Sequence, residues 1–286
     1  MVKGKSDVVI DSFVDVILFI VGFISVFPLL YVFSVSLTPI EEVLKNGGFV
    51  VIPKSINLEA YSRIIEQRLL PRAMGVTVYI TVLGTAINMF LSVLMAYPLS
   101  KDDLPGRKVL MNFVIFTMLF GGGTIPTYLM VKNLGLMNTY WAMTLPGAIG
   151  TYNMIVIKSF FENLPNDLFE SARIDGASEF RVLWQIAIPL SRAVMMTVGL
   201  FYAVGHWSTY FPAIMYISDE KMHTLQVVLR KLLNNNPELN MNVDTVVPTQ
   251  TMQMASVIFS TVPIILVYPF IQKYFTKGVM LGAIKG

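Results

Sequence analysis

The chain has no cysteine among its 286 residues and only two histidines. Without cysteine it can form no disulfide and offers no thiol for catalysis or metal binding. Neither His206 nor His223 stands at a spacing that binds zinc with another histidine or a carboxylate. No serine lies in a nucleophile elbow. These absences argue against an enzyme, and we expect no metal or other cofactor in this chain.

Charge is also scarce, at 14% of residues against roughly 25% in soluble domains. Hydrophobic residues make up 55% of the chain, and the mean hydropathy is +0.64. A membrane-spanning helix needs about 20 apolar residues, and lipid offers no partners for unpaired backbone groups. Six windows without charge are long enough for such helices: 16–40, 73–100, 109–131, 133–157, 193–218 and 245–272. The sequence therefore predicts an all-α polytopic membrane protein with six transmembrane helices.

We expect one transmembrane domain over residues 1–286, because the sequence shows no short repeat and no low-complexity linker. The first apolar segment lacks a small-residue cleavage site and is interpreted as a retained helix rather than a signal peptide. Outside the membrane we expect a short helix at Leu58 to Ile65 and an amphipathic turn at Leu225 to Leu233. The predicted spans are approximately 13–37, 73–99, 109–131, 140–161, 188–217 and 251–271.

Basic residues indicate the orientation of these spans. The net charge of +3 would suggest nucleic acid in a soluble protein, but here we expect no nucleic-acid partner and relate the charge to topology. If the N-terminus is inside, the inner segments hold twelve of the 21 Lys and Arg residues. The short loop 101–108 carries three of them. The pattern favours a cytoplasmic N-terminus and C-terminus.

The chain lacks the residues that would power transport. Gly4-Lys5-Ser6 has no glycine five positions earlier, so it is not a nucleotide-binding P-loop. The carboxylates of a proton relay are missing from the windows, apart from Asp15 at the edge of the first. Energy must therefore come from a partner, or transport is passive.

Some predicted spans contain residues that are unusual in lipid. Small and polar residues between Gly75 and Ser92 predict close helix contacts. The run 121–123 consists of three glycines, and it indicates either a fraying helix end or an unwound segment beside a path. The fifth span holds His206, Trp207 and Tyr210, which should face the protein interior or a watery cavity. These three could contact a sugar, or they could pack between helices.

A polar island from Glu170 to Pro189 interrupts the apolar chain. Two helical runs, 167–174 and 178–187, are separated by Gly176, which supplies the left-handed conformation that ends a helix. Asp167 and Glu170 have the spacing of a capping box at the first run. Pro189 lets the second run pass into an apolar segment at a bend. The island is predicted to be a helix, a sharp turn and a second helix.

This island has the composition of a docking element. Glu170, Arg173 and Asp175 form one surface of the first run, and its small alanines, Ala172 and Ala177, allow close approach. The opposite surface would place an apolar ridge in the groove of a soluble partner. That ridge consists of Leu168 and Ala172 with Phe169 or Ile174. The alternative is an ordinary solvated loop.

The island also resembles the EAA loop of permease subunits of binding-protein-dependent ABC importers. The shared residues are Glu170, Ala172, Asp175, Gly176, Ala177, Ile186 and Pro189. The segments 121–153, 203–217 and 269–286 resemble carbohydrate-importer permeases related to the smaller permease of the maltose system. Within these, the chain is similar to the Gram-positive branch of complex-polysaccharide permeases, the LplC- and YtcP-like proteins. It departs from the pattern at Ser171, usually Ala, and at Ser208, commonly Asn.

The resemblance implies a type I importer permease in a bacterial plasma membrane, forming half of a path for an oligosaccharide. The implied partners are a second permease, a dimer of ATP-binding subunits that hold ATP and Mg, and an extracellular solute-binding protein. Residues 165–189, here called the coupling loop, would transmit ATPase motion, and the tail 272–286 would be cytoplasmic. The glycine spacing of residues 277–286 separately predicts that this stretch is flexible. A passive channel or an ion-coupled carrier is the alternative. The implied coupling residues are Leu168, Phe169, Glu170, Ala172, Arg173, Asp175, Gly176 and Ala177.

Overall fold

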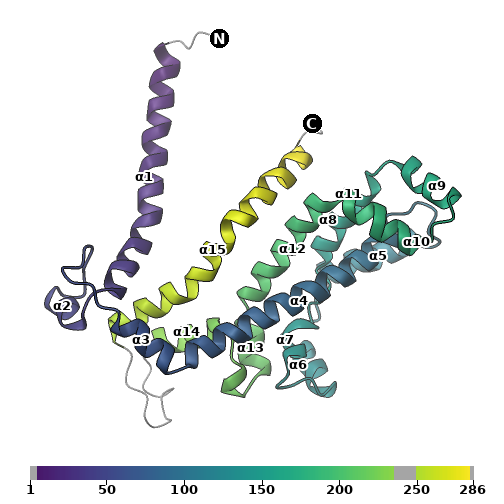
Figure 1. Ribbon diagram of the computed structural model, residues 1–286. Helices are drawn as coiled ribbons and strands as arrows, with labels where there is room; N and C mark the ends of the chain where they lie inside the picture. The colour runs from purple at the N-terminus through teal and green to yellow at the C-terminus, as the bar shows by residue number, and fades with distance from the viewer. Residues whose placement is uncertain (1–4, 235–248, 284–286) are drawn as a thin grey trace. The chain divides into compact units, whose positions relative to one another are not determined.

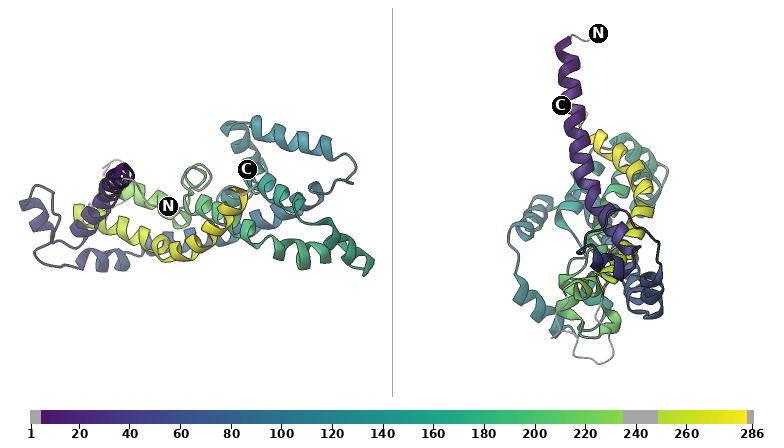
Figure 2. Two further views of the ribbon diagram at one scale, coloured as in Figure 1. Left: turned by 90° about the horizontal axis from the view of Figure 1, so that it is seen from above. Right: turned by 90° about the vertical axis from the view of Figure 1, so that its left-hand side faces the viewer.

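The computed structural model describes residues 5–234 and 249–283, and every regular element within these ranges is helical. Residues 1–4, which include Gly4 of the Gly-Lys-Ser run, and residues 235–248 and 284–286 lie outside the described residues. Figures 1 and 2 show the helices from three directions. In the first half of the chain the helices are α1 Lys5–Ser36, α2 Ile40–Lys45, α3 Glu59–Glu66, α4 Leu69–Leu99, α5 Arg107–Leu119, α6 Thr124–Asn133 and α7 Tyr140–Thr144.

The second half begins with α8 and contains the coupling loop. The predicted amphipathic turn at Leu225 to Leu233 is a helix, α14. The predicted helix Leu58 to Ile65 is confirmed within one residue as α3. The elements are α8 Thr151–Glu162, α9 Asn166–Ile174, α10 Glu179–Val182, the π-helix η1 Leu183–Ala187, α11 Ile188–Leu190, α12 Arg192–Trp207, α13 Phe211–Tyr216, the 3-10 helix η2 Glu220–Met222, α14 Leu225–Leu233 and α15 Gln250–Ala283.

Three of the predicted spans are confirmed as long apolar helices. They are Ile10–Ser36 of α1, Leu69–Leu99 of α4 and Gln250–Val267 of α15. The expectation that residues 277–286 are flexible is wrong as far as Ala283, because α15 continues to that residue, and residues 284–286 lie outside the described residues. Two bent helix pairs bring the possible spans among the described residues to at most five.

The first bent pair is α5 and α6, which meet at an angle of 110°. The chain leaves the helix at Phe120, and Gly123 has φ +85° and ψ 172°, a conformation that is essentially restricted to glycine. The predicted continuous helix 109–131 is therefore interrupted at its three glycines. The interruption is a sharp turn and not a frayed end, since a second helix begins directly at Thr124.

The predicted fourth span is also not one helix. Residues 145–150 separate α7 from α8, and they contain Pro146 followed by Gly147. Proline removes a backbone donor and glycine is a weak helix former, so the helix is lost at this point. The predicted fifth span is divided as well, by Ser191 before α12 and by residues 208–210 after it.

The chain divides into two compact units, and each is described by itself. The first comprises residues 1–71 and 228–263. Its buried centre is formed by Val35, Val43 and Val50. Thr251 donates a hydrogen bond to the carbonyl of Thr38 at 3.2 Å, which ties the start of α15 to the end of α1.

The second unit comprises residues 72–227 and 264–286 and holds the largest buried cluster. Helices α4, α8 and α12 contribute to this core, and the coupling loop shares it. In Figure 1 the coupling helices α9 and α10 lie near the end of α4 at Leu99, whereas α7 and α13 lie away from that end. The buried members are Val93, Ala96, Tyr97, Leu99, Val114, Met154, Ile157, Phe161, Phe169, Val182, Leu183, Ala187, Val194, Val198 and Tyr202.

Candidate functional site

The coupling loop has the predicted order of helix, turn and helix. Gly176 has φ +79°, so the expected left-handed residue between the two runs is confirmed. The predicted capping box is wrong, because α9 begins at Asn166 after Pro165 and has no side-chain cap. Asp167 lies instead in the first turn, where a carboxylate favours the positive end of the helix dipole. The second run is capped by Ser178, whose hydroxyl accepts the Arg181 N–H at 3.4 Å.

The second run widens into a π-helix before it reaches the membrane-spanning part of the chain. Within η1 the N–H of Ile188 bonds to the carbonyl of Leu183, five residues back. Pro189 has no N–H and its ring would clash with the carbonyl four residues earlier, which favours a wider turn here. The predicted bend is present but lies two residues later, at Ser191, where the axis turns by 86°.

One face of the coupling loop is part of the core of the second unit. Phe169 is only 3% exposed, and Ala172 and Ala177 pack against the same cluster. The Lys101 ammonium lies 3.5 Å from the centre of the Phe169 ring, within the range of a cation–π contact. The prediction that Phe169 could belong to an exposed docking ridge is therefore wrong. Phe169 holds the loop on the helices beneath it.

The opposite face of the loop presents large apolar side chains to the surroundings. Ile174 is 86% exposed and Phe180 is 60% exposed, and Leu168 is exposed as well. Glu170 and Asp175 are exposed beside them. A polar segment that leaves such side chains uncovered is typical of a surface that binds another protein.

The carboxylate of Glu179 links the two coupling helices to α4. Arg173 of α9 donates to its Oε1 at 2.7 Å, and the hydroxyl of Tyr97 on α4 donates to its Oε2 at 2.8 Å. The hydrogen bond from Arg173 is the main cause that lowers the pKa of Glu179 below its ordinary value. Burial, followed by the charge of Arg173, lowers the pKa of Lys101. This cluster links both coupling helices to the end of α4.

A polar cavity of about 430 Å³ lies beside this cluster, between α9 and the loop that follows α4. Glu170 and Arg173 line it from α9, and Lys101 and Asp102 line it from the loop. Arg107 forms ion pairs with Asp102 and with Glu162 of α8, so the wall of the cavity is braced. The cavity brings exposed charge next to the apolar outer face of the coupling loop.

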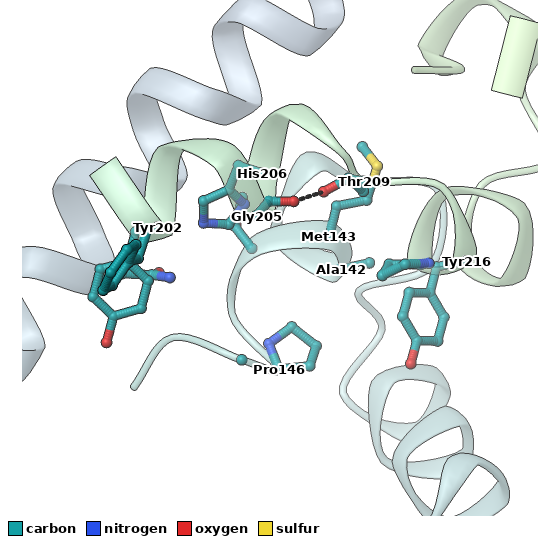
Figure 3. Close-up of a pocket in the computed structure, with 13 residues that line it drawn as sticks. Ala142, Met143, Pro146, Tyr202, Gly205, His206, Thr209 and Tyr216 are labelled. Carbon is teal, nitrogen blue, oxygen red and sulfur yellow. Dashed lines mark hydrogen bonds between the residues drawn. The ribbon is translucent and has the colours of Figure 1, made fainter. Parts of the chain in front are cut away.

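A second cavity of the same unit has a volume of about 340 Å³ (Figure 3). Figure 3 shows Tyr202 and His206 toward one end of the cavity and Tyr216 toward the other. The ring of His206 presses on α4, since a Cβ added to Gly84 would stand 2.4 Å from it. The cavity is lined by Asn88, Ala142, Met143, Thr144, Pro146, Gly147, Phe201, Tyr202, Gly205, His206, Thr209, Pro212 and Tyr216.

One buried polar atom of this cavity, Oδ1 of Asn88, has no hydrogen-bond partner among the described residues, and Asn88 is only 3% exposed. The imidazole of His206, a residue 8% exposed, lies against the backbone of Gly84 and can hydrogen-bond to it. Buried polar groups are almost always hydrogen-bonded, so Asn88 calls for water or a polar ligand. The hydroxyl of Thr85, one turn before Asn88, is also unpartnered. The lining therefore offers side-chain donors and acceptors within mostly apolar walls.

Of the three predicted substrate contacts, only His206 lines this cavity. Trp207 and Tyr210 are absent from its walls. Tyr210 packs against a small cluster that includes Ile80 and Met143. Trp207 is partly buried, and its Nε1 has no partner.

Sequence reasoning missed Asn88 and Tyr202 as residues of the cavity. The Tyr202 hydroxyl lies 2.7 Å from the Ser92 hydroxyl and accepts the N–H of Gly150 at 3.0 Å, which fixes three elements around it. A tyrosine in an apolar helix gives no signal of such a role. Asn88 does give one, because an amide in the middle of a membrane span is costly unless it faces the protein interior.

Comparisons with known proteins identify the family. Residues 1–281 match the model of the binding-protein-dependent transport system inner membrane component. The chain belongs to this family. It is 47% identical over 270 residues to the protein LplC of Bacillus subtilis, covering 93% of this chain and 91% of that one. It is 43% identical to the polygalacturonan/rhamnogalacturonan transport system permease protein YtcP of the same organism, covering 96% and 98%.

A solved structure agrees with this assignment. A chain from the crystal structure of a bacterial ABC transporter involved in the import of the acidic polysaccharide alginate superimposes with a TM-score of 0.89. It is 31% identical, and the match covers 96% of this chain and 99% of that one. The chain is thus a multi-pass membrane protein with the type I permease fold, and it is a non-enzymatic transport subunit. Its family works with a solute-binding protein and an ATPase.

Proposed function

We propose that this chain forms half of the path by which a bacterial ABC importer carries an oligosaccharide across the plasma membrane. A second permease chain supplies the other half, and a dimer of ATP-binding subunits holds ATP and Mg. The names of the relatives support a carbohydrate substrate, since one is a polygalacturonan/rhamnogalacturonan transport system permease and another belongs to a transporter involved in alginate import. The observation that carries the proposal is the two-faced coupling loop, buried at Phe169 and exposed at Ile174.

The exposed face of the coupling loop docks on the ATPase. One short polar segment carries three exposed apolar side chains, Leu168, Ile174 and Phe180. Burial of each side chain against a partner would contribute about 1.5–3 kcal/mol to binding. Glu170 and Asp175 surround them with charge that can orient a partner. Gly176 shapes the turn, because a side chain at its positive φ would be strained.

The docking is tested by replacing Ile174 with glutamate, which places a charge at the centre of the apolar face. The matched control is Ile56→Glu, since Ile56 is 73% exposed in the predicted outer segment of the chain. We expect the purified complex to lose its ATPase subunits with Ile174→Glu and to retain them with Ile56→Glu. Full retention of ATPase by the Ile174→Glu complex contradicts the docking.

The cavity around Asn88 and His206 receives part of the sugar. A sugar has apolar ring faces and hydroxyl groups, and the cavity combines apolar walls with the buried Oδ1 of Asn88, which has no partner in the part of the chain that the structure describes. Asn88→Leu preserves the approximate size of the side chain but removes its hydrogen-bonding groups. In reconstituted complexes we expect it to reduce oligosaccharide uptake while ATPase binding stays unchanged. Uptake equal to that of the unmodified complex contradicts a sugar contact at Asn88.

The N-terminus and C-terminus lie in the cytoplasm, as the distribution of basic residues favours. The absence of native cysteine makes this directly testable. Asp103→Cys and Ser55→Cys each introduce one exposed thiol, on the predicted inner and outer sides. A maleimide that cannot cross the membrane should label intact cells at residue 55 only, and labelling at residue 103 alone contradicts the orientation.

A further inference from the structure

Glu179 joins three elements at the end of the second unit. It begins α10, it accepts a hydrogen bond from Arg173 of α9, and it accepts another from Tyr97 of α4. Here these three residues are called the Glu179 bridge. Tyr97 is 6% exposed, and its ring packs edge-on against Phe161 at 5.9 Å. The phenol is held in place, so the carboxylate meets a fixed donor.

The bridge provides a direct connection between the coupling loop and α4. Along the chain, the loop reaches α12 only through the π-helix and the 86° bend at Ser191. The hydrogen bond between the Glu179 carboxylate and Tyr97 instead links the loop directly to the uninterrupted helix α4. Two charge-assisted hydrogen bonds to one carboxylate are stronger and more directional than the apolar contacts around them.

Helix α4 continues from the bridge to the cavity. Tyr97 and Asn88 are nine residues apart on it, a rise of about 14 Å at 1.5 Å per residue. On the way, Ser92 is hydrogen-bonded to Tyr202 of α12, and beyond Asn88 the helix touches His206 at Gly84. A displacement of Tyr97 is therefore transmitted along α4 to Asn88, which lines the cavity, and to the contact of Gly84 with His206, which lines it as well.

We propose that Tyr97 and Glu179 are positioning residues which transmit the movement of the coupling loop to the wall of the substrate cavity through α4. This inference rests on the proposed docking of the coupling loop on the ATPase. Lys101 supports the arrangement, because its ammonium stands over the rings of both Tyr97 and Phe169 at 4.8 and 3.5 Å. The Glu179 bridge does not itself bind the ATPase or the sugar. It determines how far closure of the ATPase moves the wall of the sugar cavity.

The test uses the complete complex reconstituted in proteoliposomes with its ATPase and its sugar-loaded binding protein. Tyr97→Phe removes only the hydroxyl that donates to Glu179, and Glu179→Ala removes the acceptor. The matched control is Tyr152→Phe, at a tyrosine of α8 that is 61% exposed. The measurements are ATPase retention, the stimulation of ATP hydrolysis by loaded binding protein, and sugar taken up per ATP hydrolysed.

We expect both variants to retain the ATPase and to lose about fivefold or more of the stimulation, with less sugar carried per ATP. The double variant should lose no more than the stronger single variant, because both remove one connection. Unchanged stimulation in Tyr97→Phe with the ATPase still bound overturns the inference. Loss of the ATPase from that variant also overturns it, because the bridge would then support docking rather than transmission.

Failure of the docking itself is distinguished by Ile174→Glu in the same preparation. If Ile174→Glu keeps its ATPase, the proposed function of the loop is wrong. If Ile174→Glu loses its ATPase while Tyr97→Phe and Glu179→Ala keep both ATPase and stimulation, only the transmission through the bridge is wrong.

Discussion

Two regions of α4 differ in how their polar groups are paired. Near Leu99, the hydroxyl of Tyr97 and both oxygens of Glu179 have partners within 2.8 Å. Near the cavity, Oδ1 of Asn88 is buried without a partner among the described residues. A paired polar network fixes a structure, whereas an unpaired group is available to water or to a passing ligand. The region around Tyr97 and Glu179 is therefore fixed by its hydrogen bonds, whereas the region around Asn88 is available to bind a ligand.

Phe169→Ala should give the largest effect, because it removes the side chain that anchors the coupling loop in the core. Deletion of a buried phenylalanine costs about 3–5 kcal/mol, and Phe169 is 3% exposed. The neighbouring Leu168→Ala is the control, since Leu168 is 42% exposed. Thermal unfolding of the purified protein in detergent measures the difference. Equal stability of the two variants would contradict a two-faced loop.

Gly84→Ala should be the next largest, because the new Cβ would stand 2.4 Å from the His206 ring. Overpacking of this kind costs about 1–3 kcal/mol. Gly75→Ala on the same helix has nothing within 4 Å of its Cβ and should be neutral or stabilising by up to about 1 kcal/mol. Thermal unfolding separates them. If Gly84→Ala is as stable as Gly75→Ala, α4 and α12 do not meet at this point.

Ser92→Ala and Asn88→Leu compare a paired and an unpaired residue one helical turn apart on α4. Ser92→Ala leaves the Tyr202 hydroxyl without one of its partners and should cost about 1 kcal/mol. Asn88→Leu removes an unpartnered carbonyl and should leave the stability unchanged or raised. Unfolding in detergent without sugar is the measurement. A larger loss of stability for Asn88→Leu than for Ser92→Ala reverses the expected difference between the paired and the unpaired residue.

Acid should give the smallest effect, through Glu179. Its pKa is lowered in the folded protein, mainly by the hydrogen bond from Arg173, so its stabilising contribution is present above its ordinary pKa. That contribution disappears as the pH falls through the lowered value. Because the Glu179 side chain is 55% exposed, we expect it to contribute at most about 1 kcal/mol to the free energy of unfolding. The stabilities of the wild type and of Glu179→Gln, measured by unfolding, should become equal in acid. A difference in stability that stays constant down to low pH contradicts the ion pair.

The sequence predicted the elements whose signals are local. A positive φ at Gly176 follows from glycine at a helix end, and the short helix at Leu58 to Ile65 was expected and is present as α3. It did not predict the division of the fourth span at Pro146, because a membrane protein can keep proline within a helix when neighbours satisfy the freed carbonyl. Local pattern also failed to choose between Phe169 and Ile174 for the exposed face.

The candidate site was predicted in part for the same reason. His206 lines the cavity, and its polarity within an apolar span was a usable signal. Asn88 gives the same signal but becomes part of a site only when α4 and α12 are placed together. The partnership of Tyr97 with Glu179 joins residues 82 positions apart, and no local pattern reveals such a contact.

Oligosaccharide uptake by proteoliposomes containing the complete complex, measured with and without ATP, tests most directly whether the coupling loop drives the cavity. The unmodified complex should take up sugar only with ATP. Gly176→Val forces a branched side chain into a left-handed conformation at a cost of about 1–3 kcal/mol and should insert normally but lose most of this uptake. Uptake by the unmodified complex without ATP, or undiminished uptake by Gly176→Val, would contradict the account.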